Sequence, residues 1–278
     1  MSDGHDISPL TRIVARLDRT SSGEPDGDLV PTGFPSIDRA IGGGFRRGDL
    51  VVLGGDDSVG ASALALGVAL RGTQRALFLT SEMQPDRVYE RALAMTARVP
   101  LEHIKLGAVE EDERARLAAS ALAMRDHAPI VETFLHGGLA NIERAVEATP
   151  AAPLVVVDTL EGTLHRDHGQ EEALSYAVLA LKRVALRHHV AVLLTTHLPE
   201  LDRDRSDRRP RLADFGLGGA VGAQADLVLG LYREEMYDFD HGVSGAAELL
   251  VLKNRGGARS YVDLYFDARY GRFEDVAE

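Results

Sequence analysis

A glycine-rich turn is the first segment of this sequence whose residues could do chemistry. The apolar run Leu50–Leu53 leads into Gly54–Gly60, and a helical pattern starts at Ala61. A strand, a glycine-rich turn and a helix N-terminus form a phosphate-binding loop, in which backbone N–H groups and the helix dipole attract an anion. The predicted nucleotide-binding residues are Gly55, Ser58, Gly60, Ala61 and Ser62.

The loop departs from the usual G-x-x-x-x-G-K-[ST] pattern at one position. Gly55 and Gly60 take the glycine positions, and Ser62 takes the position of the hydroxyl that binds Mg²⁺. Ala61 replaces the lysine that reaches the β- and γ-phosphates. Removing one preorganised charge costs about 3–4 kcal/mol of transition-state stabilisation. We therefore expect weak or absent ATP turnover.

Other charges near the loop bear on the missing lysine. The two aspartates between the glycines would each repel a phosphate by about 2 kcal/mol at ~8 Å, with an effective dielectric constant near 20. Any substitute cation must come from elsewhere in the chain. Arg46, Arg47 and Arg75 are the candidates that the sequence suggests.

The elements that must position this loop alternate along the chain, and alternation of strands and helices indicates parallel strands joined by helical crossovers. The last three strands follow one another closely and are expected to form an antiparallel extension of an α/β sheet. The expected strands are Leu50–Gly54, Ala76–Thr80, Pro153–Asp158, Val190–Thr196, Asp226–Tyr232, Glu248–Lys253 and Ser260–Phe266. The expected helices are Ala61–Arg71, Asp86–Arg98, Glu111–Arg125, Leu139–Ala148 and Glu171–Arg187.

The N-terminal segment has a different character. Residues Ile7–Arg19 have the spacing of a short amphipathic helix, and the polar stretch Ser21–Asp28 indicates a flexible linker. The apolar stripe of such a helix packs either on its own domain or on a neighbouring subunit. We expect two regions, namely a linker helix with its linker at 1–30 and one domain at 31–278.

Composition excludes several classes of protein. The chain has 278 residues, no cysteine, no basic or apolar leader and no apolar run long enough for a membrane span, which is typical of a cytoplasmic protein. The formal net charge of −12 argues against a broad basic surface for nucleic acid, but not against a narrow basic channel inside an oligomer.

The wider pattern resembles the C-terminal RecA-type motor domain of DnaB-family replicative helicases, from Pro31 to Ala277. The matching segments, in the order of that family, are Pro31–Asp38, Gly42–Leu50, Phe78–Met83, Leu154–Asp158, Thr195–Leu198, Arg209–Asp214, Gln224–Arg233, Lys253–Gly257 and Arg272–Glu274. The resemblance implies a RecA-like core, ATP with Mg²⁺ as cofactor, and action on single-stranded DNA in replication. We expect no counterpart here of the family's separate N-terminal helical domain.

The resemblance also implies roles for individual residues. Glu82 matches the carboxylate that activates the attacking water, and Asp158 matches the acid that holds Mg²⁺ through water. Ser62 matches the direct Mg²⁺ ligand. His197 stands where the family has a glutamine that senses the γ-phosphate.

Two cations near the C-terminus imply an oligomer. Lys253 and Arg255 match residues that one subunit presents to the γ-phosphate of its neighbour. Such contacts require a ring, which in this family is a hexamer, and the N-terminal helix then corresponds to the helix that packs on the adjacent subunit. We expect that deleting the residues before Pro31 weakens self-association.

Two segments fall where the family threads single-stranded DNA, Glu161–Glu172 and Leu201–Gly222. The second is locally basic, although aspartates interleave. Phe215–Gly219 replaces a stretch where the family usually carries an arginine and a glutamate. The predicted DNA contacts are Arg203, Arg205, Arg208 and Gly219.

Two hypotheses of different class remain open. The first is an ATP-dependent DNA helicase or translocase, supported by Glu82, Asp158, Lys253 and Arg255. The second is a catalytically inactive scaffold or regulatory partner of a helicase or of other replication proteins, supported by Ala61 and the aspartates beside it. A RecA- or KaiC-like signalling ATPase fits less well, because the segments after Glu82 match the helicase pattern better.

Overall fold

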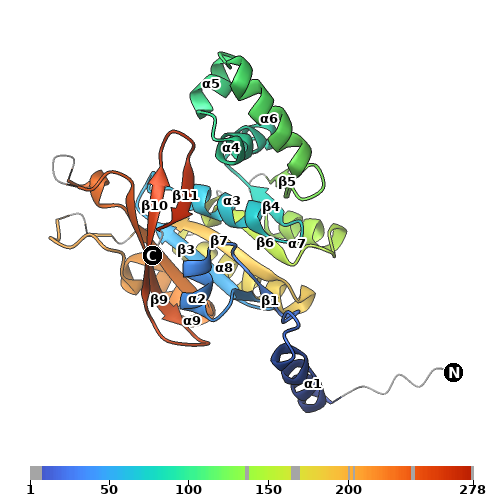
Figure 1. Cartoon of the computed structure of the whole chain (residues 1–278). Coiled ribbons are helices and arrows are strands. Elements are labelled where there is room, and N and C mark those ends of the chain that lie inside the picture. The colour runs from blue at the N-terminus through green and yellow to red at the C-terminus, as the bar shows by residue number, and fades with distance from the viewer. Residues whose placement is uncertain are drawn as a thin grey trace.

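A nine-stranded sheet forms the centre of the computed structural model, which describes residues 8–134, 138–163, 170–199, 201–202, 204–238 and 242–276. The strand order is β11-β10-β9-β8-β3-β7-β6-β4-β5 (Figure 1). The strands are β3 (Leu50–Gly55), β4 (Leu77–Thr80), β5 (Ile130–Thr133), β6 (Leu154–Asp158), β7 (Ala191–His197), β8 (Leu227–Tyr232), β9 (Ala246–Asn254), β10 (Tyr261–Asp267) and β11 (Arg272–Asp275).

Six neighbouring strands, from β8 to β5, are parallel, and β9, β10 and β11 continue the sheet in antiparallel fashion. The mostly parallel α/β sheet with antiparallel C-terminal strands is therefore confirmed. One detail of the prediction was wrong. The first of the three late strands, β8, pairs in parallel with β3 and only its other edge is antiparallel, to β9. A long segment precedes β8 and returns the chain to the opposite end of the sheet, whereas short turns lead into β10 and β11.

Helices cover both faces of the sheet, so that its central strands are buried on both sides. Along β3, Val51 and Leu53 face one core with α2, α3 and α4, while Leu50 and Val52 face a second core with α7, α8 and α9. The bounds are α2 (Pro35–Ile41), α3 (Ala61–Arg71), α4 (Pro85–Ala97), α5 (Leu101–Leu106), α6 (Glu111–Met124), α7 (Leu139–Ala148), α8 (Gln170–His188) and α9 (Ala220–Gln224). None of the helices described is long and apolar enough to cross a bilayer.

Helices α4, α5 and α6 form a group that projects from one end of the molecule, and α1 (Pro9–Ser21) projects from another (Figure 1). No residue of α1 is buried, and its apolar residues are 46–73% exposed: Leu10, Ile13, Val14 and Leu17. The helix therefore does not pack its apolar stripe on its own domain. After α1, the first strand is β1 (Leu29–Val30), which pairs with β2 (Phe45–Arg46).

Candidate nucleotide site

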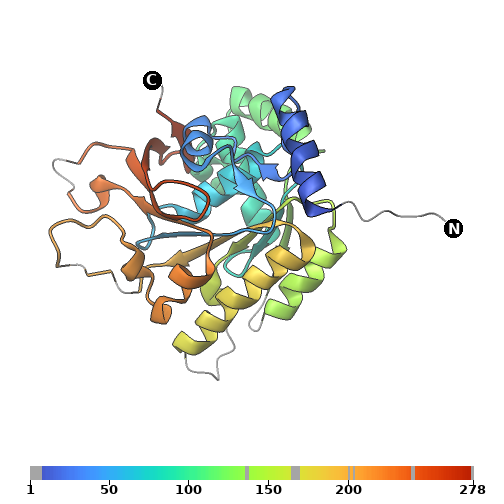
Figure 2. The ribbon, with the colours of Figure 1, turned by 90° about the horizontal axis from the view of Figure 1, so that it is seen from below.

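A cleft of about 470 Å³ lies where the parallel strands end. Its walls come from the glycine-rich loop after β3, the first turn of α3, the residues that follow β4 and β6, and the last residues of β7. Arg91 of α4, Phe266 of β10 and Gly271 complete the lining. Figure 2 shows the same strands from below, with α7 and α8 along one face. The carboxyl ends of parallel strands meet at one edge of a sheet, and this edge is the usual place for a ligand in open α/β folds.

The loop keeps the backbone of an anion site. Gly60 has φ +105°, and a Cβ there would lie 3.0 Å from the ring of Phe273, so this position requires glycine. Gly60 also serves as the N-cap of α3, and no side chain caps that helix. The N–H groups of the first turn of α3 are therefore available to an anion.

Three side chains from separate elements meet at the base of the cleft. The hydroxyls of Ser62 and Thr195 each donate a hydrogen bond to Oδ1 of Asp158 at 2.7 Å. Asp158 is fully buried, and its Oδ2 has no hydrogen-bond partner in the described part of the chain. Burial raises the pKa of Asp158, and the two hydroxyls oppose that rise. A serine hydroxyl beside a buried carboxylate with a spare oxygen fits Mg²⁺, which prefers oxygen ligands.

Glu82, the predicted catalytic carboxylate, lines the cleft two residues after the end of β4. Its backbone N–H donates to Oγ1 of Thr80 at 3.2 Å, which fixes the bend after the strand. Burial and the nearby charge of Asp158 raise the pKa of Glu82, while His197 acts in the opposite direction. A half-buried carboxylate with a raised pKa suits a general base, because its pKa lies closer to neutral pH.

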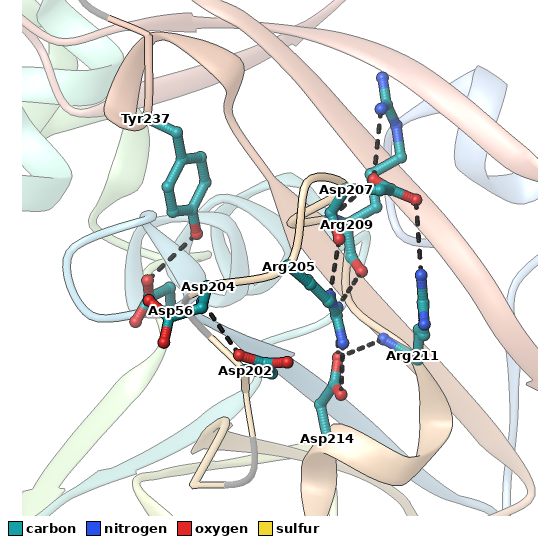
Figure 3. A network of polar contacts seen from close by, with 9 residues as sticks. All are labelled: Asp56, Asp202, Asp204, Arg205, Asp207, Arg209, Arg211, Asp214 and Tyr237. Carbon is teal, nitrogen blue, oxygen red and sulfur yellow. Dashed lines mark hydrogen bonds and ion pairs between the residues drawn. The ribbon is translucent and has the colours of Figure 1, made fainter.

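The two aspartates of the loop are held by side chains of the same chain. Oδ1 of Asp57 lies 3.0 Å from Nδ1 of His197, the residue at the sensor position. The hydroxyl of Tyr237 donates to Oδ2 of Asp56 at 3.1 Å (Figure 3). Burial and Asp56 raise the pKa of Tyr237, so this hydroxyl stays protonated and donates at neutral pH. His197 therefore contacts a carboxylate of the phosphate-binding loop.

Arg233 also contacts the phosphate-binding loop, and the sequence did not predict this role. Arg233 is buried, stacks 4.1 Å above the ring of Phe266, and donates to the carbonyl of Val59 at 3.3 Å. Its position directly after β8 carries no periodic signal, so sequence alone gave no reason to select it.

The three arginines suggested as substitutes for the missing lysine line no part of the cleft, so that suggestion was wrong. Arg47 donates to the carbonyl of Gly27, and Arg75 donates to that of Ala128. Both, like Arg46, precede β3 or β4 and thus lie near the amino ends of the parallel strands. The cation that does line the cleft is Arg91 of α4, which is far from the loop in sequence.

Lys253 and Arg255 lie at the opposite end of the sheet from the cleft. Lys253 on β9 is opposite Val228 at the start of β8, whereas the loop residue Gly55 is in register with Leu231. Three residues along a strand correspond to about 10 Å. Neither cation is therefore directed at the cleft of its own chain.

Both cations are engaged by their own chain. The ammonium of Lys253 donates to the carbonyls of Gly222 and Ala225, at 2.8 and 2.5 Å, at the end of α9. Arg255 donates to Oδ1 of Asp226 at 2.7 Å. Burial lowers the pKa of Lys253.

The predicted DNA segment contains a network of paired charges (Figure 3). Arg205 donates to both oxygens of Asp214 at 2.8 and 2.7 Å, and the two side chains are only 13% and 6% exposed. Arg209 is held by Glu248 in the same two-pronged manner. The carboxylates thus neutralise two of the arginines in this segment.

The other predicted DNA contacts differ in their surroundings. Arg208 is half-buried and stacks 5.3 Å from the ring of Tyr237. Gly219 has φ +82° and precedes α9, with open space around it. Arg203 and residues 164–169 lie outside the described residues.

The sheet order and the cleft at its carboxyl edge place this chain among the RecA-like α/β proteins. The RadB recombinase shares the fold, with a TM-score of 0.57 and 18% identity over 90% of this chain and 100% of that one. The chain belongs to the DnaB-like helicase C terminal domain family, whose sequence profile matches residues 29–275.

Similar proteins agree with this assignment. The "Replicative DNA helicase DnaB" of Leifsonia xyli subsp. xyli is 28% identical over 98% of this chain and 62% of that protein. The Geobacillus stearothermophilus protein of the same name is 24% identical over 90% of this chain and 58% of that protein. The chain thus spans about three fifths of the length of these curated relatives.

Two solved structures share the whole fold. One, described as an ATPase domain, has a TM-score of 0.86 and 24% identity, over 99% of this chain and 100% of that one. A DnaB-like replicative helicase, described with its interactions with primase, has a TM-score of 0.84 and 22% identity, over 100% of this chain and 69% of that one. The predicted RecA-like fold and DnaB family are therefore confirmed.

Proposed function

We propose that this protein is a ring-forming, DnaB-type motor subunit that binds ATP with Mg²⁺ and hydrolyses it weakly or not at all. One observation carries the proposal. Ser62, Asp158 and Glu82 are assembled around one cleft, while Ala61 leaves the phosphate-binding loop without its lysine. The side chains that would hold a metal and activate water are present, whereas the lysine that would neutralise phosphate charge is replaced by alanine.

The residues of the cleft would divide the work as follows. The first turn of α3 would hold the phosphates, and Ser62 with Asp158 would hold Mg²⁺. The metal supplies charge neutralisation on the phosphates when it is bound. Glu82 would accept a proton from water at the γ-phosphate, and His197 would exchange Asp57 for the phosphate. Without the lysine, we expect turnover lower by about 10²–10³-fold.

A ring explains two features that one chain leaves incomplete. Lys253 and Arg255 lie at the end of the sheet away from their own cleft, so they serve the cleft of a neighbour. Helix α1 presents an apolar stripe to solvent, and an open groove of about 640 Å³ is lined by α6 and by the C-terminal ends of α3 and α4. We propose that α1 of one subunit packs into this groove of the next, and that the ring is a hexamer. The division at residue 30 separates this docking helix from the domain.

Sedimentation velocity tests the ring. Replacing Leu10, Ile13 and Leu17 by serine removes the apolar stripe without touching the core, because all three are exposed. We expect the ring to dissociate into smaller species, while Arg12→Ser on the polar face of α1 leaves it intact. Unchanged sedimentation of the triple variant would rule out the docking role of α1.

Hydrolysis is measured on the same samples. We expect little or no release of phosphate from ATP by the natural protein. Fast turnover that disappears in Glu82→Gln would refute impaired hydrolysis, because the activity would then depend on the proposed base.

We propose that single-stranded DNA occupies the central channel of the ring. The protein would act in the cytoplasm, during replication. Arg203, Arg208 and the backbone at Gly219 would contact phosphates. Arg205 can contribute only if it releases Asp214. We therefore expect weak, salt-sensitive binding of an oligothymidylate to the ring.

A catalytically inactive scaffold, partner to a helicase or to other replication proteins, is the second candidate. The self-contained contacts favour it, since His197 is engaged by Asp57 and Lys253 by two carbonyls. Under this alternative the ring forms, yet neither ATP nor DNA binds to it. Equilibrium binding of both ligands to the natural ring separates the two candidates.

A further inference from the structure

The cleft contains one cation that no part of the phosphate-binding loop supplies. Arg91 of α4 lines the cleft together with the residues of the loop. It makes no hydrogen bond or ion pair with any residue of the described ranges. Its neighbour Arg87, one turn earlier on the same helix, is paired with Glu90 at 2.8 Å. A cleft-lining guanidinium without a partner differs from an ordinary solvated helix charge.

Arg91 acts on two carboxylates of the cleft. Burial raises the pKa of Glu82 and Asp158, and the charge of Arg91 opposes that rise in both. Arg91 therefore lies close enough to act on both groups of the proposed hydrolytic site. Beyond Arg91 lies an adjoining hollow of about 410 Å³, lined also by Met83, Lys105 and the paired Arg87 and Glu90. Arg91 is the cation that the cleft and this hollow share.

The loop side carries two carboxylates, and each of them contacts a side chain from another part of the chain. Tyr237 donates to Asp56, and His197 pairs with Asp57, so the two carboxylates are turned toward partners of their own chain. The first turn of α3 remains uncapped. An anion that enters between α3 and α4 would find backbone N–H groups on one side and Arg91 on the other.

We infer that Arg91 takes over the charge of the missing lysine, so that a triphosphate is bound between α3 and a cation from α4. Guanidinium is always protonated, and it binds a phosphate with two parallel N–H···O bonds, which an ammonium does not do. The inference rests on the proposed function, and it identifies the ligand feature that Arg91 recognises as the β/γ end of the nucleotide.

Affinity for phosphate groups is the property to measure. The natural protein, as the full chain, and its Arg91→Ala, Arg91→Lys and Arg91→Gln variants are titrated with fluorescent analogues of ATP and AMP in Mg²⁺. Arg87→Ala is the matched control on the same helix. Loss of a two-pronged charged contact lowers affinity by roughly 10- to 100-fold. We expect that loss for ATP in Arg91→Ala and Arg91→Gln, a smaller loss in Arg91→Lys, and almost none for AMP or in Arg87→Ala.

The ratio of the affinities for ATP and AMP distinguishes a role of Arg91 in binding phosphate from a role in maintaining the fold. A structural role of Arg91 would weaken ATP and AMP equally, and that result would overturn the inference. An unchanged preference for ATP in Arg91→Ala would also overturn it. So would the absence of ATP binding by the natural protein.

Sedimentation of the same samples separates failure of this inference from failure of the proposed function. A ring that binds no ATP refutes the role of Arg91 and leaves ring formation standing. A protein that binds ATP through Arg91 without forming a ring refutes only the assembly, because Arg91 and the phosphate-binding loop line the cleft of the same chain.

Discussion

Restoring the lysine at position 61 tests directly whether the cleft is a phosphate site. Ala61 is the first residue of α3 and lines the cleft, so a lysine there extends from the same helix start that would hold the phosphates. A unit charge ~4 Å from a phosphate charge gains about 4 kcal/mol at an effective dielectric constant of 20. Repulsion from Arg91 and desolvation of the ammonium reduce that gain. We expect about 3 kcal/mol, which corresponds to roughly 100-fold tighter binding.

The assay is equilibrium binding of a fluorescent ATP analogue in Mg²⁺ by the natural protein and by Ala61→Lys. Ala61→Met is the matched control, because methionine has a similar length and no charge. We expect the control to bind like the natural protein, and the gain in Ala61→Lys to shrink as salt is added. Equal affinities of Ala61→Lys and Ala61→Met would refute the reasoning, because they would mean that the nucleotide's phosphates do not lie at the start of α3.

Two further predictions concern buried charges. Asp158→Asn keeps the oxygen that accepts from both hydroxyls and removes a buried charge. We therefore expect it to stabilise the fold by about 1 kcal/mol at pH 7, which raises the melting temperature by about 2–4 °C. Because burial raises the pKa of Asp158 above its usual 3.8, the folded state loses stability as pH rises through that range, and the advantage of the asparagine should vanish toward pH 4 in scanning calorimetry. Lys182 donates to buried Asp226 at 2.5 Å, so Lys182→Met should destabilise the fold by about 3 kcal/mol in urea titrations. A cost below ~1 kcal/mol would show that Arg255 alone compensates that carboxylate.

The long elements of this fold could be predicted from the sequence because their patterns are unambiguous. Buried strands such as β3 and β6 are continuous apolar runs, and the expected bounds of α3 and α7 coincide with those observed. Short elements such as α5 and β11 were missed. Six residues make fewer than two helical turns, and four residues leave little alternation to detect, so tertiary contacts decide such segments.

The sequence predicted the residues that follow the strands of the candidate site, but not the arginine that α4 contributes to it. The loop, Glu82 and Asp158 follow apolar strands, and the end of a parallel strand is a position that sequence can locate. Arg91 is in the middle of an amphipathic helix, where a charge normally indicates a solvated face. Nothing in the spacing reveals that this face borders the cleft. Proximity to Gly55 in sequence suggested other arginines, whereas the topology of the sheet decides which cation is close.

If the ring forms, the nucleotide's phosphates connect two subunits, because the cleft of one subunit would face Lys253 of the next. Lys253 leaves two carbonyl partners on its own chain whenever it contacts a neighbour's nucleotide, so the nucleotide must offset their loss. A nucleotide held only by α3 and Arg91 is bound less firmly than one that also contacts a lysine. The self-contained state of Lys253 is then favoured more than in a ring with an intact loop. In the proposed ring, alanine at position 61 would therefore weaken both the chemistry in one cleft and the coupling between neighbouring subunits, and this is why we expect a weakly coupled ring.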